Sequence, residues 1–469
     1  MASKEAPVFD PDSFRDRIAT VDESGKRRWI YPKQPFGQYY NWRKIVSYLC
    51  LIILFGMPFL KVNGQPFFLF NVLERKFILF GLTFWPQDFH LFALAMVTLF
   101  VFIVLFTVMF GRIWCGWACP QTIFMEMVFR RIEYWIEGTH TQQIRLAKAP
   151  WNRDKILKKG SKWGLFALIS FLIGNTLMAW IIGVDELAEV VIEAPTQNWG
   201  RFTFVMLFSG IFLFIFTYFR EQACIAVCPY GRLQGVLLGK KSIVVIYDWL
   251  RGEPRGKKSK QNAAKELGDC VSCNQCVAVC PTGIDIRNGT QMECVNCTAC
   301  IDACNNIMDK VGRPRGLIRY DSYDGIMEGS GFKLTTRVFA YCSVLLALIS
   351  VLSFSLSSRS AVETTILRSP GSRYQTTEDG LIVNLYSLQF INKTQDNIHP
   401  EVLLSGHPGE LEVIGKEVVV EPQGMYKGAI LIKIRPEDLD SRATKIQLSI
   451  QVDGQEIDRI KSSFLGPMK

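Results

Sequence analysis

Residues 270–281 read CVSCNQCVAVCP and residues 294–305 read CVNCTACIDACN, so one C-x2-C-x2-C-x3-C pattern occurs twice. Three thiolates at this spacing wrap around one cubane, and the fourth cysteine of each run ligates the cluster of the other run. The sequence therefore predicts two [4Fe–4S] clusters with four cysteine ligands each. One set is Cys270, Cys273, Cys276 and Cys304, and the other is Cys294, Cys297, Cys300 and Cys280.

Two other uses of these cysteines fit the pattern less well. Zinc knuckles usually combine two C-x2-C pairs, or cysteine with histidine, in one module of four ligands. A disulfide framework belongs to an oxidising compartment, whereas the loop charges predict a cytoplasmic location for both runs. The second run ends in Asn305 where the bacterial ferredoxin pattern has proline. Proline there shapes the backbone and is not a ligand, so the predicted ligand sets are unaffected.

Segments rich in β-branched residues flank the two runs. They read SIVVIYD at 242–248 and GLIRY at 316–320, and we expect them to be strands that pair with each other. Residues 250–262 read LRGEPRGKKSKQN, which predicts a basic, solvated tether that favours anionic lipid headgroups. No aromatic or motif context accompanies this charge, so nucleic acid is not an expected partner. We expect residues 241–337 to form a bacterial dicluster ferredoxin-like domain.

Five apolar stretches are long enough to cross the hydrocarbon core of a bilayer. They cover residues 43–60, 89–110, 163–183, 202–219 and 338–356. The first four belong to a predicted α-helical transmembrane domain, 43–240, which follows a polar N-terminal tail, 1–42. The tail has no early apolar region with a cleavage site, so no signal peptide is expected. A further apolar region, 67–84, is interrupted by charges, and we expect it to be re-entrant or interfacial.

Lysine and arginine are distributed unevenly between the loops, which sets the expected orientation. The N-terminal 44 residues carry 9 of them, loop 111–162 carries 10 and segment 220–337 carries 17. Loops 61–88 and 184–201 carry only 3 and 1. We therefore expect a multi-pass protein of the bacterial inner membrane, with the N-terminus and both clusters cytoplasmic. Five spans then place residues 360–469 in the periplasm.

A second cysteine motif follows the second and the fourth predicted span. Residues 110–121 read FGRIWCGWACPQ and residues 219–231 read FREQACIAVCPYG, which align as an internal repeat. If each C-x3-C-P segment is helical, both of its sulfurs lie on one face, and the proline begins the next helix. Residues 121–138 are expected to form that helix, with an amphipathic face, after the first motif.

The two motifs together could form a site of four thiolates, from Cys115, Cys119, Cys224 and Cys228. Soft thiolates favour Cu(I), zinc or iron–sulfur clusters. The alternative is four buried cysteines that serve only packing, although packing does not explain the repeated proline. Cys50 and Cys342 lie alone within spans and are expected to pack as small apolar residues. Only 4 histidines occur, and no pair lies within the spans, so a bis-histidine haem is not expected.

The C-terminal region alternates apolar and polar residues with a period of two. The strand-like runs cover 381–392, 410–415, 417–422, 426–434 and 445–452. About seven short strands in this region predict an all-β immunoglobulin-like sandwich over residues 360–469. The region has no cysteine, so a disulfide is not available to it. Docking to a partner is its expected role, with plain stabilisation as the alternative.

Taken together, these residues resemble the CcoG family of cytochrome c oxidase accessory proteins, also called FixG or RdxA. The resemblance covers essentially the whole chain. Its motifs are GKRRWIYP (25–32), LTFWPQDF (82–89), the two C-x3-C-P runs, RGEPRG (251–256) and the two cluster runs. The resemblance implies a reductase of Cu(II) to Cu(I) that acts in the assembly of cbb3-type haem–copper oxidases.

We expect copper to be the substrate and the C-x3-C-P thiols to bind it and favour Cu(I). A rival mechanism has these thiols reduce Cu(II) themselves and form a disulfide that the clusters re-reduce. Two other functions stay open: a conduit from quinol to another cytoplasmic acceptor, and a non-enzymatic assembly scaffold. Expected partners are membrane lipid, a copper chaperone or transporter, oxidase assembly factors and a second copy of the chain. The electron donor is not identified by any nucleotide- or flavin-binding motif.

Overall fold

The computed structural model describes residues 20–467 apart from 22–23, 25, 63, 73–75, 193–198, 257–266, 330–335, 370–373, 395, 416–417 and 453. The chain divides into two compact units. The first contains residues 1–60, 68–74 and 89–352 and holds every cysteine of the predicted sites. The second contains residues 61–67, 75–88 and 353–469.

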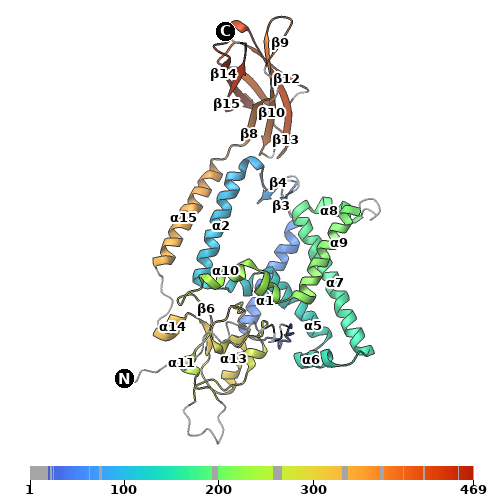
Figure 1. Cartoon of the computed structure of the whole chain (residues 1–469), viewed down its shortest axis with the longest axis vertical. Helices are drawn as coiled ribbons and strands as arrows, with labels where there is room; N and C mark the ends of the chain where they lie inside the picture. Colours follow the sequence, from blue (N-terminus) through green and yellow to red (C-terminus); the bar gives the residue numbers. More distant parts are fainter. Residues whose placement is uncertain are drawn as a thin grey trace. The chain divides into compact units, whose positions relative to one another are not determined.

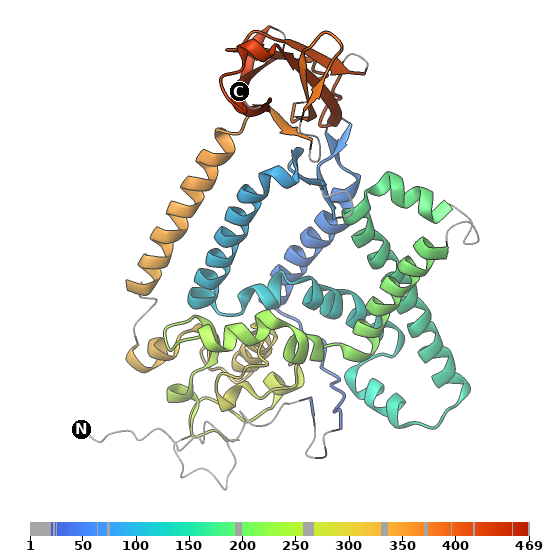
Figure 2. The same cartoon turned by 45° about the horizontal axis from the view of Figure 1, so that its top comes forward.

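Five helices of the described chain are long and apolar enough to cross a membrane, and each matches a predicted span (Figures 1 and 2). They are α1 (Gln38–Gly56), α2 (Phe89–Phe110), α7 (Arg153–Ile182), α9 (Trp199–Phe214) with its π-helical extension η4 (Ile215–Phe219), and α15 (Thr336–Ser357). Many of their apolar side chains are exposed, as expected for helices that face lipid.

Two of these helices begin earlier than their apolar residues predict. α7 starts ten residues before the predicted span, because the Asn152 side chain caps it by accepting from the Lys155 amide at 2.9 Å. α1 starts at Gln38, and its first amides are capped from another part of the first unit. The Asp302 carboxylate accepts from the Tyr39 amide at 3.2 Å and from the Tyr40 amide at 2.8 Å. Capping from a distant segment leaves no signal in the local sequence.

Shorter helices of the first unit connect the spans and carry the cysteine motifs. After α2 come α3 (Ile113–Trp117), α4 (Pro120–Ile123), the π-helical η3 (Phe124–Phe129), α5 (Arg130–Ile136) and α6 (His140–Lys148). α8 (Val184–Ile192) follows α7, and the π-helical η5 (Ala223–Val227) and α10 (Pro229–Leu237) follow η4. The predicted helix 121–138 is thus three consecutive helical segments that end at Ile136.

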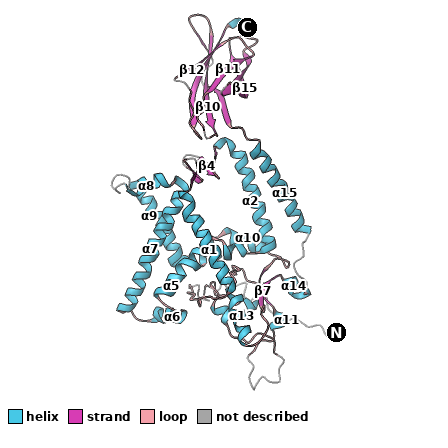
Figure 3. Cartoon of the chain, turned by 180° about the vertical axis from the view of Figure 1, so that it is seen from behind, coloured by secondary structure: helices cyan, strands magenta, loops and turns pink. Residues whose placement is uncertain are grey.

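α7 and α9 lie side by side in the first unit (Figures 1 and 3). Their backbones approach closely where Gly174 faces Ser209, because a Cβ on Gly174 would lie 2.6 Å from the Ser209 hydroxyl. Near the ends of these helices, the Phe129 ring stacks on Phe216 with centroids 4.4 Å apart and meets Phe166 edge-on at 4.7 Å. This aromatic cluster joins the segment after the first C-x3-C-P motif to both helices.

The ferredoxin-like segment contains the predicted strand pair. β6 (Val244–Tyr247) runs antiparallel to β7 (Ile318–Asp321), with Tyr247 opposite Ile318. Its helices are α11 (Trp249–Gly252), α12 (Gln275–Ala278), η7 (Ile286–Asn288), α13 (Ala299–Lys310) and α14 (Tyr323–Glu328). Residues 257–262 of the predicted basic tether lie outside the described residues, and its first residues, 250–252, belong to α11.

The C-terminal part of the second unit is the predicted β-sandwich (Figure 3). One sheet has the order β12-β13-β10-β8 with β9 beside β10, and the other has the order β11-β14-β15. The strands are β8 (Val362–Arg368), β9 (Gln375–Thr376), β10 (Ile382–Asn392), β11 (Pro400–Ser405), β12 (Glu410–Ile414), β13 (Met425–Ile434), β14 (Ala443–Val452) and β15 (Gln455–Leu465). Inward-facing residues of both sheets form one core, including Tyr386, Phe390, Ile430 and Phe464.

The apolar region 67–84 forms strands. β3 (Phe68–Asn71) belongs to the first unit, whereas β1 (Lys61–Val62), β2 (Gln65–Pro66) and the hairpin of β4 (Lys76–Leu79) and β5 (Leu82–Phe84) belong to the second. The buried Gln423 side chain bonds to Thr83 at 2.5 Å and to the Gly81 carbonyl at 3.2 Å. Asp88, in η2 (Pro86–Asp88), pairs with Arg359 at 2.6 Å and Lys393 at 2.9 Å. These contacts make the hairpin part of the C-terminal unit, which the sequence did not predict.

Candidate metal centres

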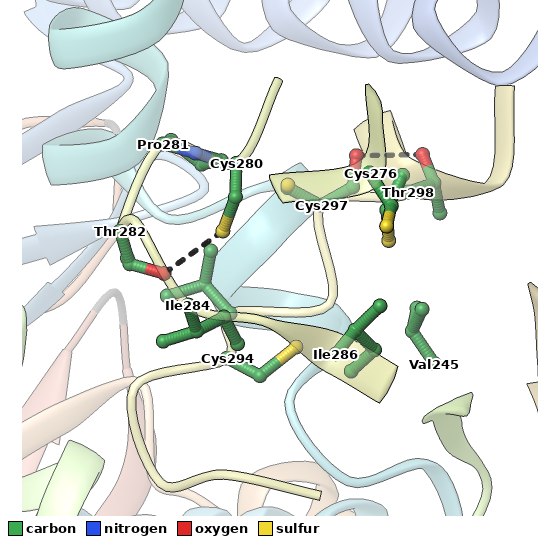
Figure 4. A pocket seen from close by; sticks show the side chains of 12 residues that line it. Val245, Cys276, Cys280, Pro281, Thr282, Ile284, Ile286, Cys294, Cys297 and Thr298 are labelled. Atoms are coloured by element: carbon green, nitrogen blue, oxygen red, sulfur yellow. Dashed lines mark hydrogen bonds between the residues drawn. The ribbon is translucent and has the colours of Figure 1, made fainter. Parts of the chain in front are cut away.

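Two cavities of the first unit are lined by cysteine side chains. One has about 330 Å³ of empty volume and is lined by Cys270, Cys273, Cys276 and Cys304. The other has about 350 Å³ and is lined by Cys280, Cys294, Cys297 and Cys300, and Cys276 lines both cavities (Figure 4). Each run therefore contributes its last cysteine to the cavity of the other run. The spacing of the runs groups the cysteines into the same two sets.

Left-handed backbone conformations explain how each run curls around its cavity. Ser272 and Asn274 have φ of 53° and 55°, and Asn296 and Thr298, at the equivalent positions of the second run, have 54° and 65°. Such values are uncommon for residues other than glycine, and for a β-branched threonine they are strained. α12 and α13 begin directly after these turns. The strain therefore lies at the positions that bring three closely spaced cysteines to one cavity.

Burial dominates the electrostatics of these thiols. It raises the pKa of Cys276, Cys294 and Cys304 to about 12, and it raises the pKa of Cys300 well above its ordinary value. Such thiols stay protonated at neutral pH unless a cation stabilises the thiolate. The cavities therefore suit a metal-containing group, whose positive charge offsets the burial of four thiolates.

The cysteines of each set stand around the walls of a cavity. A zinc knuckle needs four ligands that meet one ion at about 2.3 Å from each sulfur. A cubane of several iron atoms has its four ligands standing around it. Sulfurs that line the walls of two cavities fit the cubane.

The C-x3-C-P segments have the same local structure in both repeats. Cys119 and Cys228 precede α4 and α10 with almost equal backbone angles, φ −63° and ψ 124° against φ −65° and ψ 113°. Pro120 and Pro229 are the first helical residues, as predicted. The segment before each proline is only partly helical, because the extended ψ at the second cysteine ends α3 and η5 before it. Proline disfavours helical angles in the residue before it.

The four C-x3-C-P thiols influence one another electrostatically. Burial, followed by the neighbouring thiols Cys119, Cys115 and Cys228, raises the pKa of Cys224 to about 12. Burial likewise raises the pKa of Cys115 to about 11, with smaller contributions from Cys119 and Cys228. The thiols of the two motifs therefore lie near enough to influence one another, although among the described residues no three of them converge on one metal position.

A buried amide adjoins this thiol group. Gln234 is fully buried, and its Oε1 accepts from the Cys115 thiol at 3.5 Å. Its Nε2 has no hydrogen-bond partner among the described residues, and a buried donor without a partner is costly. A half-turn of the amide would let Nε2 donate to a Cys115 thiolate. Gln234 thus suits a metal-bound thiolate better than the free thiol, and nothing in the local sequence indicates this role.

The thiol group adjoins the second cysteine cavity. Cys115 packs against the apolar cluster that contains Val295 and Cys297. Trp117 donates from its indole nitrogen to the Tyr320 hydroxyl at 3.0 Å, and that hydroxyl donates to the Asn296 carbonyl at 3.0 Å. Arg112, just before the first motif, donates to the Met292 and Gly231 carbonyls. Protein atoms of the first C-x3-C-P motif, including Cys115, therefore contact the loop that carries Cys294 and Cys297.

Gly116, between the two cysteines of the first motif, permits this close approach. A Cβ at this position would lie 2.4 Å from the Val295 carbonyl oxygen, so Gly116→Ala must displace the cysteine loop. We expect this variant to lose about 1–3 kcal/mol of stability and to release iron at a lower temperature, measured by the visible absorbance during heating. Gly164→Ala on α7 is the control, because nothing lies within 4 Å of its added methyl group. Equal iron release by both variants would contradict this role.

The GKRRWIYP segment packs beside the second motif through buried charges. Arg27 pairs with Glu221 at 3.0 Å, and Arg130 pairs with the same carboxylate at 3.5 Å. Arg130 also donates to the Pro281 carbonyl at 3.0 Å. The N-terminal tail, the helix after the first motif and the end of the first cysteine run therefore meet at Glu221. Cys50 and Cys342 lie in α1 and α15 and line neither cysteine cavity.

Known protein families match three parts of the chain. Residues 92–138 match a family described as "4Fe-4S binding domain", residues 219–323 match "4Fe-4S dicluster domain", and residues 352–467 match "IG-like fold at C-terminal of FixG". The dicluster match begins before the second C-x3-C-P motif, so it includes Cys224 and Cys228 as well as both cysteine runs.

Three curated proteins are similar over most of their length. Protein RdxA of Cereibacter sphaeroides is 35% identical, covering 81% of this chain and 83% of that protein. Protein RdxB of the same organism is 34% identical over 78% and 80%. Nitrogen fixation protein FixG of Rhizobium meliloti is 30% identical over 82% and 80%.

The fold, the cysteine cavities and these matches define a class of protein. The chain is a multi-domain membrane protein of iron–sulfur electron transfer, with [4Fe–4S]-binding ferredoxin domains and an immunoglobulin-like domain. It belongs to the FixG/RdxA family.

Proposed function

We propose that this protein reduces Cu(II) to Cu(I) for the assembly of cbb3-type cytochrome c oxidase. The observation that carries the proposal is that Cys115 and Gly116 of the first C-x3-C-P motif lie against the loop that carries Cys294 and Cys297. Soft thiolates bind Cu(I) well. A Cu(II) ion bound at these thiolates could receive one electron from a cluster in the neighbouring cysteine cavity. A site that binds the product more tightly than the substrate also makes the reduction more favourable.

The eight cysteines of the two runs are the proposed cluster ligands. Cys270, Cys273, Cys276 and Cys304 would hold one [4Fe–4S] cluster, and Cys280, Cys294, Cys297 and Cys300 the other. When bound, each cluster supplies one electron at a time, at a potential between about −700 and +450 mV. Arg287, held by Asp285 at 2.7 Å, and Arg112 lie near the first and second set and offset part of the thiolate charge.

The C-x3-C-P thiols are the proposed copper site. Cys115, Cys119, Cys224 and Cys228 would bind copper, with the Gln234 amide donating to the Cys115 thiolate. Cu(II) gains one electron there and leaves as Cu(I). A copper chaperone or transporter would receive the ion, and oxidase assembly factors would use it. The dithiol alternative, in which one cysteine pair is oxidised to a disulfide, uses the same residues.

The proposed orientation follows from the basic loops. The ferredoxin-like domain and all twelve proposed ligands would face the cytoplasm, and the immunoglobulin-like domain would face the periplasm. Reporters fused after residues 337 and 360 are expected to indicate the cytoplasm and the periplasm respectively. A periplasmic signal from the first fusion would contradict the proposed source of electrons.

The direct test uses protein purified without oxygen. We expect about eight iron atoms per chain, and we expect the protein, after reduction with dithionite and removal of the excess, to convert about two Cu(II) per chain. Cu(I) is measured with a chromogenic chelator, and the reduced clusters are counted by EPR. Iron-free protein, or reduced protein that leaves Cu(II) unchanged, would refute the proposal.

A further inference from the structure

A large groove lies at the N-terminal part of α7. It has about 1370 Å³ of empty volume, and its walls come from the N-terminal tail, α5, α7 and the end of η4. Trp29, Trp151, Trp163 and Phe166 supply aromatic rings. Glu133 and Arg220 supply polar groups that are buried. Aromatic walls with a few placed polar groups are typical of a site for a small organic ligand.

The groove lies where the apolar part of α7 begins. Lys155, Lys159 and Lys162 precede this point, and Trp163 and Phe166 follow it. Trp151 and Trp163 are exposed, and tryptophan is enriched at the surface of a membrane. This position suits a ligand with a polar head and an apolar tail that enters from the bilayer.

The cations of the groove are already paired with protein groups. Arg220 pairs with Glu133 at 2.5 Å, and Lys162 pairs with Glu137 at 2.8 Å. Lys159 pairs with the same Glu137 at 2.8 Å, and Lys155 donates to the carbonyls of Ala147 and Ala149 at the end of α6. A lipid phosphate or a flavin phosphate would have to displace these partners. The groove is therefore built for an uncharged ligand that both donates and accepts hydrogen bonds.

Arg220 connects the groove with the thiol group. Its side chain lines the groove, and it also lines a smaller cavity that contains Cys224 and Glu221. Its backbone has φ of 52°, which is strained for arginine and marks the break between η4 and η5. A ligand in the groove therefore shares Arg220 as a wall with the cavity that contains Cys224. A redox-active ligand at this position could pass electrons toward the thiol group, whereas a structural lipid could not.

We propose that this groove binds the headgroup of a membrane quinol, which donates the electrons that the protein transfers. The inference rests on the proposed electron-transfer function and does not depend on copper as the acceptor. One quinol becomes one quinone and releases two electrons and two protons. Two one-electron acceptors of the iron–sulfur class take the electrons. The Glu133 carboxylate accepts a hydrogen bond from one quinol hydroxyl, and both protons leave to water at the groove mouth.

The test compares binding and electron delivery in the full-length protein in detergent. A photoreactive azido-quinone is expected to label residues 151–166, as mapped by mass spectrometry. Trp151→Ala combined with Trp163→Ala removes two aromatic contacts and should weaken quinone binding about tenfold. Trp135→Ala is the matched control, because Trp135 is exposed on α5 and lies outside the groove. Anaerobic short-chain ubiquinol or menadiol should reduce the clusters of the control but reduce those of the double variant about tenfold more slowly at low quinol.

Two outcomes would overturn the inference. One is labelling outside the groove, or equal labelling of the double variant and the control. The other is loss of the label when phosphatidylglycerol vesicles compete, which would assign the groove to a lipid headgroup. Dithionite-reduced protein separates this test from the copper proposal. If it reduces Cu(II) while quinol reduces no cluster, only the quinol site fails, and the opposite pattern refutes only copper as the acceptor.

Discussion

Cys115→Ser combined with Cys119→Ser is expected to lower the rate of Cu(II) reduction about a hundredfold or more, while the iron content stays unchanged. Mutating a residue that supports a metal ligand already lowers metal affinity or activity about 10–100-fold. This variant removes two of the four proposed soft ligands themselves. The iron content stays because neither thiol lines a cysteine cavity. Cu(I) release from the reduced protein is the measurement, and Cys342→Ser, an exposed cysteine of α15, is the control.

The matched variant Cys224→Ser with Cys228→Ser separates the two thiol mechanisms. A shared four-thiolate copper site loses its function when either motif is changed. If one motif acts alone as a reducing dithiol, only one of the double variants loses activity. Undiminished reduction by both variants would remove the C-x3-C-P thiols from the mechanism and leave electron transfer by the clusters alone.

Cys304→Ser is expected to lose about four of about eight iron atoms, and the lost cluster should be that of the first run. Cys304 follows the second run in sequence but lines the cavity of Cys270, Cys273 and Cys276. Cys273→Ser should lose the same cluster. The combination of both changes should therefore retain about four iron atoms, as each single variant does.

Combining Cys273→Ser with Cys280→Ser gives the opposite expectation. Cys280 belongs to the first run but lines the cavity of the second, so this pair should lose both clusters and nearly all iron. Iron and sulfide analysis with EPR of the reduced protein measures both combinations. If each run held its own cluster, the Cys273 and Cys280 pair would retain half of the iron and the Cys273 and Cys304 pair would lose it all.

Much of the architecture could be predicted because it follows from local patterns. The five spans follow from apolar length, β6 and β7 from their β-branched residues, and the sandwich from alternation with a period of two. The helix starts at Pro120 and Pro229 follow from the fixed φ of proline. The hairpin of residues 76–84 could not be predicted in the same way, because Gln423 and Asp88 join it to residues more than 250 positions away.

In the candidate site, too, features encoded by nearby residues could be predicted, and contacts between distant segments could not. The cysteine spacing predicts two sets of four sulfurs, because the fourth cysteine of such a run ligates the cluster of the other run, and the two cavities group the cysteines in the same way. It was not sufficient to indicate the left-handed turn at Thr298, a residue type that seldom adopts it. Nor could it indicate Gln234 or Arg112, because a donor beside a thiolate is defined by its distance in space.

The sequence by itself determined the class of this protein: apolar helices, two cysteine runs and a β-sandwich, each encoded by residues close together in the chain. Only the tertiary structure decided that Gly116 allows the C-x3-C-P thiols to approach the second cysteine cavity, and that Arg220 lies between those thiols and an aromatic groove. The physical reason is that periodicity and ligand spacing act over one or two turns of backbone. The contacts that would carry electrons join segments that are far apart in the chain, and packing alone brings them together.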